Sequence, residues 1–167
     1  MLSGETAFGK YPLESVQMMT RIAKEVESSL STFTNSPYET EKTVTSYLAK
    51  AAVKASLRLS TSGLVADSIS GKTILNLVAY RGENPIYAQC YSKRVMRELA
   101  LSYGVYASFM PGEVTSHEFL HTALTRLLAD KLVDEDSLLT VLAGNFGAAF
   151  GASYVEISTV RNLLQRK

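Results

Sequence analysis

The chain has 167 residues, of which 46% are hydrophobic and 20% charged, values that suit one globular domain with an appended segment and exclude a disordered or collagen-like chain. Seventeen basic residues nearly balance sixteen acidic ones, and the net charge of +1 gives no basic field to attract a nucleic-acid partner. One cysteine excludes an internal disulfide, so we expect a reduced, cytoplasmic protein. No apolar run approaches the ~18–20 residues of a membrane helix, so we expect no membrane partner.

The first element expected is a helix over residues 11–30, where apolar side chains recur at helical spacing. Pro12 suits the first helical position, where its missing N–H is not needed. The next stretch, residues 31–36, is polar and aperiodic and is the expected linker. A second helix is expected at about 37–58, because Ser36 and Glu39 have the spacing of a capping box.

Beyond residue 58, short apolar runs alternate with helical patterns. The expected strands are residues 64–66, 86–90, 105–110, 138–143 and 154–157, and the helices between them are roughly 71–81, 93–103 and 116–132. Gly82 and Gly104 stand where helix-ending glycines belong.

This alternation determines the expected fold class. Strands that alternate with helices pair in parallel through right-handed crossovers, whereas the last two strands are joined by a loop and predict an antiparallel edge. The expected fold is α/β: a three-layer sandwich with a mixed sheet of about five strands, four parallel and one antiparallel at the edge, preceded by one helix.

The segment Asp67–Thr73 joins a strand to a helix and gathers hydroxyls, a glycine and a lysine. The free N–H groups of a helix N-terminus favour an anion, Gly71 permits close backbone approach and Lys72 adds a point charge. We therefore expect a phosphate cradle; the alternative is a plain turn in which Ser70 caps the helix. A nucleotide-triphosphatase loop is disfavoured because Ala66 stands where its first glycine belongs. The candidate phosphate ligands are Ser68, Ser70, Gly71, Lys72 and Thr73.

A second loop, residues 144–151, follows the fourth strand and holds three glycines. In open α/β sheets ligands collect at this carboxyl edge, so the loop is a candidate ligand-binding loop. The alternative is a flexible connection to the edge strand. The candidate loop residues are Gly144, Asn145, Phe146, Gly147 and Gly151.

His117, Glu118 and His121 form an H-E-x-x-H motif, which places two histidines one helical turn apart with a glutamate as base. Catalytic zinc needs a third protein ligand, and with only two histidines in the chain this would have to come from the acidic run at 134–136. A zinc hydrolase is thus a disfavoured alternative, and no metal site is expected. Cys90 lies in an apolar strand, which predicts a buried, unreactive thiol.

The N-terminal string MLSGETAFGKYPLESVQMMTRIAKEVE resembles the end of the eighth strand and the eighth helix of the pyruvate kinase barrel. Later segments resemble the C-terminal domain of that family. They are Ser70–Thr73 (the effector-phosphate loop), Ala79–Arg81, Pro85–Ala88, Arg97–Val105, and Val141–Gly144 with the glycine-rich loop after it. The resemblance covers essentially the whole chain.

The resemblance implies three parts: a barrel remnant at 1–30, a linker at 31–36 and a C-terminal regulatory domain at 37–167. Pyruvate kinases transfer the phosphoryl group of phosphoenolpyruvate to ADP in glycolysis, giving pyruvate and ATP, with Mg²⁺ and usually K⁺. The family's catalytic lysine, metal ligands and phosphate-binding arginine lie in earlier parts of the barrel, so this chain alone should be inactive and hold no cofactor. Only Ser3 and Glu5, with Thr6 beside them, carry over from the active site.

The resemblance also implies a regulatory role. Ser68, Ser70, Lys72 and Thr73 would grip the phosphate of an effector while residues 144–151 close over the rest, which would favour an active homotetramer. Relatives that use fructose 1,6-bisphosphate often carry an arginine in the second loop, which here holds Asn145 and no cation. The expected effector is therefore a monophosphate, or inorganic phosphate at an unregulated site. A structural assembly module without effector binding is the alternative.

The first helix lacks its usual partner. In the family its apolar stripe packs on the barrel, and a short isolated helix is marginally stable. We expect it to project from the sheet domain or to be poorly protected from amide exchange.

Overall fold

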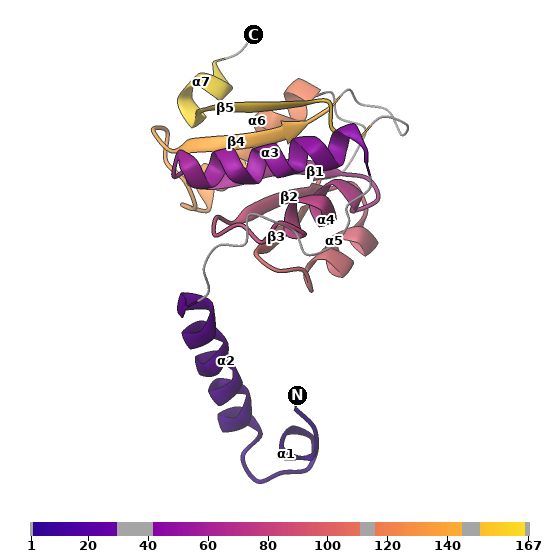
Figure 1. Ribbon diagram of the computed structural model, residues 1–167, viewed down its shortest axis with the longest axis vertical. Coiled ribbons are helices and arrows are strands. Elements are labelled where there is room, and N and C mark those ends of the chain that lie inside the picture. Colours follow the sequence, from indigo (N-terminus) through magenta and orange to yellow (C-terminus); the bar gives the residue numbers. More distant parts are fainter. Residues whose placement is uncertain (1, 30–41, 111–115, 145–150, 166–167) are drawn as a thin grey trace. The chain divides into compact units, whose positions relative to one another are not determined.

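A computed structural model describes residues 2–29, 42–110, 116–144 and 151–165 of the chain (Figure 1). The chain divides into two compact units, Met1–Thr32 and Phe33–Lys167. No helix in the described part is long and apolar enough to cross a membrane.

The first unit consists of two helices, α1 (Gly4–Ala7) and α2 (Pro12–Ser29). The helix expected over residues 11–30 is therefore confirmed. The apolar stripe of α2 is largely exposed, with 46% of Val16 and 54% of Ile22 accessible to solvent. The segment Gly4–Ala7 forms a helical turn where the resemblance implied the end of a strand, because the described part of this unit offers no neighbouring strand to pair with.

The second unit is built on a five-stranded sheet in the order β3-β2-β1-β4-β5 (Figure 1). The strands are β1 (Gly63–Ser68), β2 (Ile86–Cys90), β3 (Val105–Phe109), β4 (Leu138–Ala143) and β5 (Tyr154–Thr159). Strand β1 pairs in parallel with β2 and β4, and β2 pairs in parallel with β3, whereas β4 and β5 are antiparallel. The expected α/β fold, with four parallel strands and one antiparallel edge, is confirmed.

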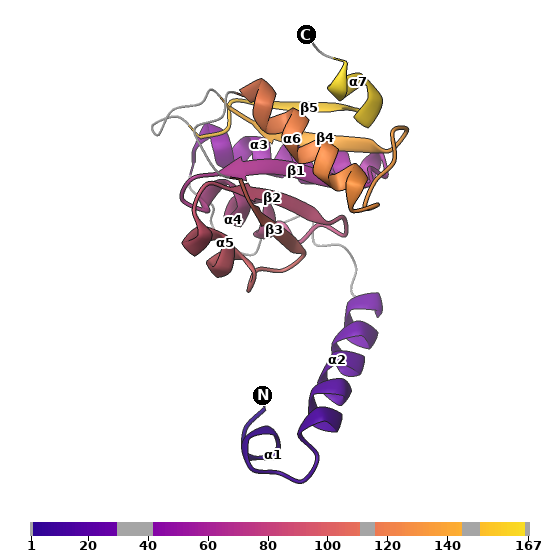
Figure 2. The ribbon, with the colours of Figure 1, turned by 180° about the vertical axis from the view of Figure 1, so that it is seen from behind.

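Helices cover both faces of this sheet (Figures 1 and 2). The helices on one face are α3 (Val44–Arg58), α4 (Lys72–Val78) and α5 (Lys93–Leu99); those on the other are α6 (Ser116–Ala129) and α7 (Val160–Leu164). Alternate residues of a strand point to opposite faces, so Leu64 and Ala66 of β1 join the core under α3 and α4, while Val65 joins the core under α6. The second unit thus has the expected three layers.

The start of α3 differs from the sequence expectation. Thr43 has an extended backbone and its hydroxyl accepts a hydrogen bond from the Ser46 N–H at 3.2 Å, which caps the helix there. The expected start near residue 37 was therefore wrong in the described part, where Lys42 and Thr43 are not helical. The capping box beginning at Ser36 and the linker at 31–36 lie outside the described residues.

The other helix ends agree with expectation only in part. Helix α4 ends at Val78, and Arg81 rather than Gly82 takes a left-handed backbone, with φ of 43°. Gly104 does have positive φ, at 67°, before β3. Helix α7 was not predicted, because five residues are too few to show a helical period.

Candidate anion site at the carboxyl edge of the sheet

The turn after β1 is shaped by a buried hydroxyl. Ser68 is 5% exposed and its Oγ accepts a hydrogen bond from the Gly71 N–H at 2.8 Å. Gly71 has φ of 86°, a left-handed conformation that glycine adopts without strain. Ser68 and Gly71 together therefore fix the path of the chain from the strand into α4.

The remaining predicted residues of this loop are accessible. Ser70 and Lys72 are exposed and Thr73 is half-buried. Lys72 takes part in no salt bridge within the described residues. The N-cap of α4 is Gly71, without a side-chain cap, so the alternative in which Ser70 caps the helix was wrong.

The backbone at the start of α4 adds donors to the same turn. The Leu75 N–H donates to the Gly71 carbonyl, which is the first hydrogen bond of the helix. The N–H groups of Lys72, Thr73 and Ile74 precede that bond and have no helical acceptor. The exposed hydroxyl of Ser70, the ammonium of Lys72 and these N–H groups are all donors that can bind an anion.

The second predicted loop leaves the sheet at the same edge. Strands β1 and β4 are parallel, with Ala66 beside Leu142, so their carboxyl ends lie together. A Cβ on Gly144 would collide with the Gly151 carbonyl oxygen, so glycine is required where the two ends of the loop meet. Asn145, Phe146 and Gly147 lie outside the described residues.

The end of this loop is attached to α3. Thr45 Oγ1 accepts a hydrogen bond from the Ala152 N–H at 3.1 Å, and a Cβ on Gly151 would collide with the same hydroxyl. One side chain in the first turn of α3 therefore positions the end of the glycine-rich loop. The sequence pattern gave no sign of this contact, which joins residues 107 positions apart.

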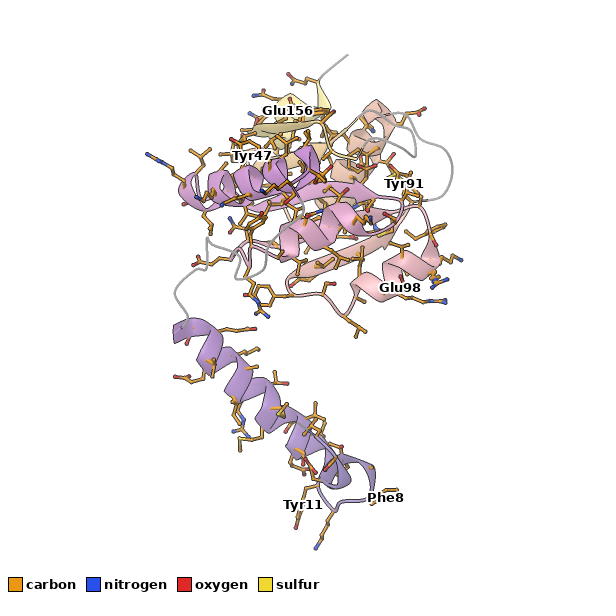
Figure 3. All side chains as sticks on the ribbon, turned by 45° about the vertical axis from the view of Figure 1, so that its right-hand side comes forward. Phe8, Tyr11, Tyr47, Tyr91, Glu98 and Glu156 are labelled. Carbon is orange, nitrogen blue, oxygen red and sulfur yellow. The ribbon has the colours of Figure 1, made fainter. Side chains whose placement is uncertain are left out.

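A carboxyl–phenol pair lies at the same edge and was missed by sequence reasoning. The hydroxyl of Tyr91, a residue labelled in Figure 3, donates to Asp67 Oδ2 at 3.0 Å. Burial raises the pKa of Asp67, although the bond from Tyr91 opposes that shift. Burial, followed by the charge of Asp67, raises the pKa of Tyr91, so the phenol stays neutral. The one available signal was an aspartate at the end of an apolar strand.

Cys90 conforms to its expected character. The residue is fully buried in β2, and burial together with the nearby Asp67 raises the pKa of its thiol to about 11. Because the thiolate is the reactive form, this cysteine is unreactive at neutral pH.

The histidine motif lies on α6, where His121 is exposed. In the described part of the chain, no three histidine, cysteine or acidic side chains gather as metal ligands. The acidic side chains at 134–136 have other partners. Asp134 accepts a hydrogen bond from the Ser137 hydroxyl at 2.7 Å. Glu135 and Asp136 both form salt bridges with Arg161. The described residues thus give the zinc alternative no third ligand.

The residues predicted to be active-site remnants lie together in the first unit. Ser3 Oγ donates to Glu5 Oε2 at 3.1 Å, and Thr6 Oγ1 donates to the Ser3 carbonyl at 2.9 Å. The backbone N–H of Glu5 and then the Ser3 hydroxyl lower the pKa of Glu5. Ser3 and Glu5 are exposed and Thr6 is half-buried, and Glu5 gives the cluster a negative charge.

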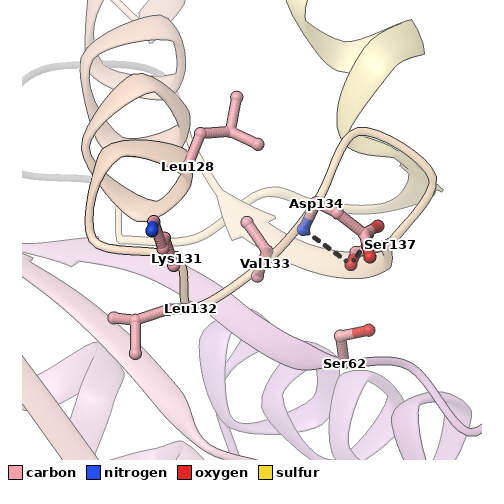
Figure 4. A pocket seen from close by; sticks show the side chains of 7 residues that line it. All are labelled: Ser62, Leu128, Lys131, Leu132, Val133, Asp134 and Ser137. Atoms are coloured by element: carbon pink, nitrogen blue, oxygen red, sulfur yellow. Dashed lines mark hydrogen bonds between the residues drawn. The ribbon is translucent and has the colours of Figure 1, made fainter.

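An open pocket of about 380 Å³ lies at the opposite, amino edge of the sheet, between the end of α6 and the start of β4 (Figure 4). It is lined by Ser62, Leu128, Lys131, Leu132, Val133, Asp134 and Ser137. None of the predicted site residues lines it. The pocket is therefore separate from the two loops at the carboxyl edge.

Comparison with known proteins agrees with this architecture. Residues 46–158 match the family model described as "Pyruvate kinase, alpha/beta domain". The class is thus an alpha/beta domain with two candidate ligand loops at the carboxyl edge of its sheet. Because the match covers more than half of the chain, the chain belongs to the pyruvate kinase family.

Curated relatives agree with this assignment. The pyruvate kinase of Borreliella burgdorferi is 34% identical over 99% of this chain and 36% of its own length. The pyruvate kinase of Geobacillus stearothermophilus is 31% identical over 99% of this chain and 29% of its own length. That of Thermoplasma acidophilum is 26% identical over 99% of this chain and 30% of its own length. The chain spans about a third of the length of these relatives.

Proposed function

We propose that this chain is the C-terminal, regulatory part of a pyruvate kinase, whose complete chain transfers the phosphoryl group of phosphoenolpyruvate to ADP with Mg²⁺ and K⁺. Family membership and alignment over 99% of the chain support this assignment. Phosphoryl transfer needs cationic groups and metal ions around the moving phosphate. The active-site remnants Ser3, Glu5 and Thr6 include no cation, so the chain alone is expected to be inactive.

The proposed role of the chain itself is to bind a phosphorylated effector. One observation carries this proposal: the turn after β1 leaves the side chains of Ser70, Lys72 and Thr73 accessible. The glycine-rich loop leaves β4 at the same edge of the sheet. Hydroxyls, backbone N–H groups and an ammonium form charge-assisted hydrogen bonds with phosphate oxygens. Ser68 would contribute indirectly, because its hydroxyl holds the turn that carries these groups.

The charge of the two loops favours a small effector. Lys72 is the one cation of the first loop, and residues 144–151 contain no lysine or arginine. A second phosphate group would therefore lack a cationic partner within these two loops. We propose a monophosphate effector whose uncharged part faces the glycine-rich loop.

A second candidate function, assembly without effector binding, is favoured by exposed apolar and aromatic residues of α3 and of the edge strand β5. Val44 and Tyr47 of α3 are 67% and 73% exposed, and Tyr154 of the adjacent edge strand β5 is 37% exposed. Such residues are typical of interfaces between subunits. The two candidates are compatible in a homotetrameric parent whose equilibrium the effector shifts.

Thermal unfolding with a panel of phosphometabolites separates the two candidates. A ligand at 100 times its Kd adds ~2.7 kcal/mol, which raises Tm by about 5–10 °C for a chain of this size. Effector binding predicts such a rise for a sugar monophosphate or inorganic phosphate, its loss in Lys72→Ala, and its retention in the matched control Lys54→Ala. Assembly alone predicts no rise with any phosphate compound.

A further inference from the structure

Within the described residues, strand β3 forms one edge of the sheet and pairs with β2 on one side only. The Ile86 N–H bonds to the Gly104 carbonyl and the Met110 N–H bonds to the Cys90 carbonyl. In this parallel register the even-numbered residues of β3 turn their backbone groups toward β2. Ala107, at the centre, turns its N–H and C=O to the free side.

This edge lacks the usual protection against pairing. Natural edge strands carry a charged residue, a proline or a bulge, and the sequence Val-Tyr-Ala-Ser-Phe of β3 contains no charged residue and no proline. Tyr106 is 61% exposed, and its ring lies 6.0 Å from that of Tyr87. In Figure 2 none of the described helices lies in front of β3, on the face of the sheet turned to the viewer.

Cations held over aromatic rings flank both ends of the edge. The Arg81 guanidinium lies 4.8 Å from the centre of the Tyr103 ring, just before β3 begins. Lys93 Nζ lies 5.4 Å from the centre of the Phe109 ring, where β3 ends. Stacking on a ring fixes a cation in place without neutralising it.

These cations are available to a partner. Arg97 follows Lys93 by one turn on α5 and so lies on the same face of that helix. Within the described residues neither of them, nor Arg81, forms a salt bridge, whereas Arg94 on the same helix pairs with Glu98 at 2.8 Å. The free edge therefore runs between uncompensated positive charges.

We propose that β3 binds an extended, acidic peptide segment of another protein, which adds a sixth strand to the sheet. Backbone hydrogen bonds to Ala107 supply affinity, and carboxylates placed against Arg81, Lys93 and Arg97 supply specificity. At ~3.3 Å per residue, β3 spans about 13 Å, so acidic residues about four positions apart reach both ends.

The test is a fluorescence-anisotropy titration of the 167-residue chain with a synthetic peptide of about ten residues, in which aspartates flank a Val-Thr-Val-Thr core. The matched peptide has glutamine in place of every aspartate. The acidic peptide is expected to bind about tenfold more tightly, with an advantage that falls as salt rises. Equal binding of the two peptides overturns the proposal.

Chain variants locate the binding. Ala107→Pro removes the outward N–H and leaves the bonds to β2 intact, so the peptide should no longer bind. Lys93→Gln and Arg97→Gln should each weaken binding about two- to fivefold, whereas the matched Arg94→Gln should not. Unchanged binding in Ala107→Pro, or equal losses in all three charge variants, contradicts the proposal. The charge variants decide the question if Ala107→Pro does not fold.

Discussion

The hydroxyl of Ser68 is buried and accepts the Gly71 N–H, while the hydroxyl of Ser70, two residues later, faces solvent. The two serines of this loop therefore have different roles. The first shapes the turn and the second is free to contact a ligand. This division leads to opposite expectations for their removal.

Ser68→Ala should destabilise the fold by about 1–3 kcal/mol, because it leaves the Gly71 N–H buried without an acceptor. Ser70→Ala, the matched control, should change stability by less than about 0.5 kcal/mol and instead weaken phosphate binding. Urea unfolding measures the first effect and phosphate titration the second. Equal stability of the two variants would contradict the assignment.

The Asp67 carboxyl makes stability depend on pH. Its pKa is raised in the folded state above the ordinary value of 3.8, so the folded chain holds this proton more tightly than the unfolded chain does. The contribution of Asp67 to stability therefore falls as pH rises from 3.8 through the raised pKa. Wild type should gain stability relative to Asp67→Asn on acidification through that window. Urea unfolding of both proteins between pH 4 and 7 checks this, and a constant difference would contradict it.

At the scale of elements, the strands were predictable because each is a short apolar run between polar turns. The expected strands at 86–90 and 138–143 match β2 and β4 at both ends. Helix ends were less predictable, because Thr43 and Thr159 cap α3 and α7 through single side-chain bonds that periodicity does not register.

The candidate site was predictable only in part. The sequence predicts an anion-binding loop because hydroxyl side chains, Gly71 and Lys72 occur together between a strand and a helix. The Tyr91–Asp67 bond joins residues 24 positions apart, and the Thr45–Ala152 bond joins residues 107 apart. Such pairs follow from strand register and helix placement, which no local pattern encodes.

The attachment of the glycine-rich loop to α3 is testable at one side chain. Thr45→Val removes the acceptor of the Ala152 N–H and should speed exchange of that amide, with a loss of about 1–2 kcal/mol in stability. Thr45→Ser, the matched control, keeps the hydroxyl and should preserve protection. Hydrogen exchange followed by NMR reads the Ala152 amide directly. Unchanged exchange in Thr45→Val would show that the bond does not hold the loop.

At the scale of the whole molecule, the two units differ in how their helices are stabilised. Helices of the sheet unit bury side chains such as Leu77 and Leu124 fully, whereas Leu13 and Ile22 of α2 stay more than half exposed. Helices without tertiary packing open readily. Within the described residues of its own unit, α2 has no buried side chains of this kind, so we expect its amides to be poorly protected from exchange.

Hydrogen exchange across the chain should show amides of α2 exchanging at least about a hundredfold faster than those of β1 and β4. The strands are the internal reference, since their backbone bonds lie between two helical layers. Protection of α2 equal to that of β1 would mean that the helix is buried against a partner, such as a second copy of the chain.

The central claim is that Ser70–Thr73 binds a phosphate group. The most direct measurement is an amide chemical-shift titration of the chain with a sugar monophosphate, repeated on Lys72→Ala. We expect saturable shifts concentrated at Gly71, Lys72 and Thr73 in the wild type and none in the variant. Absence of shifts at this turn, or shifts that persist without the lysine, would contradict the claim and leave assembly as the function of the domain.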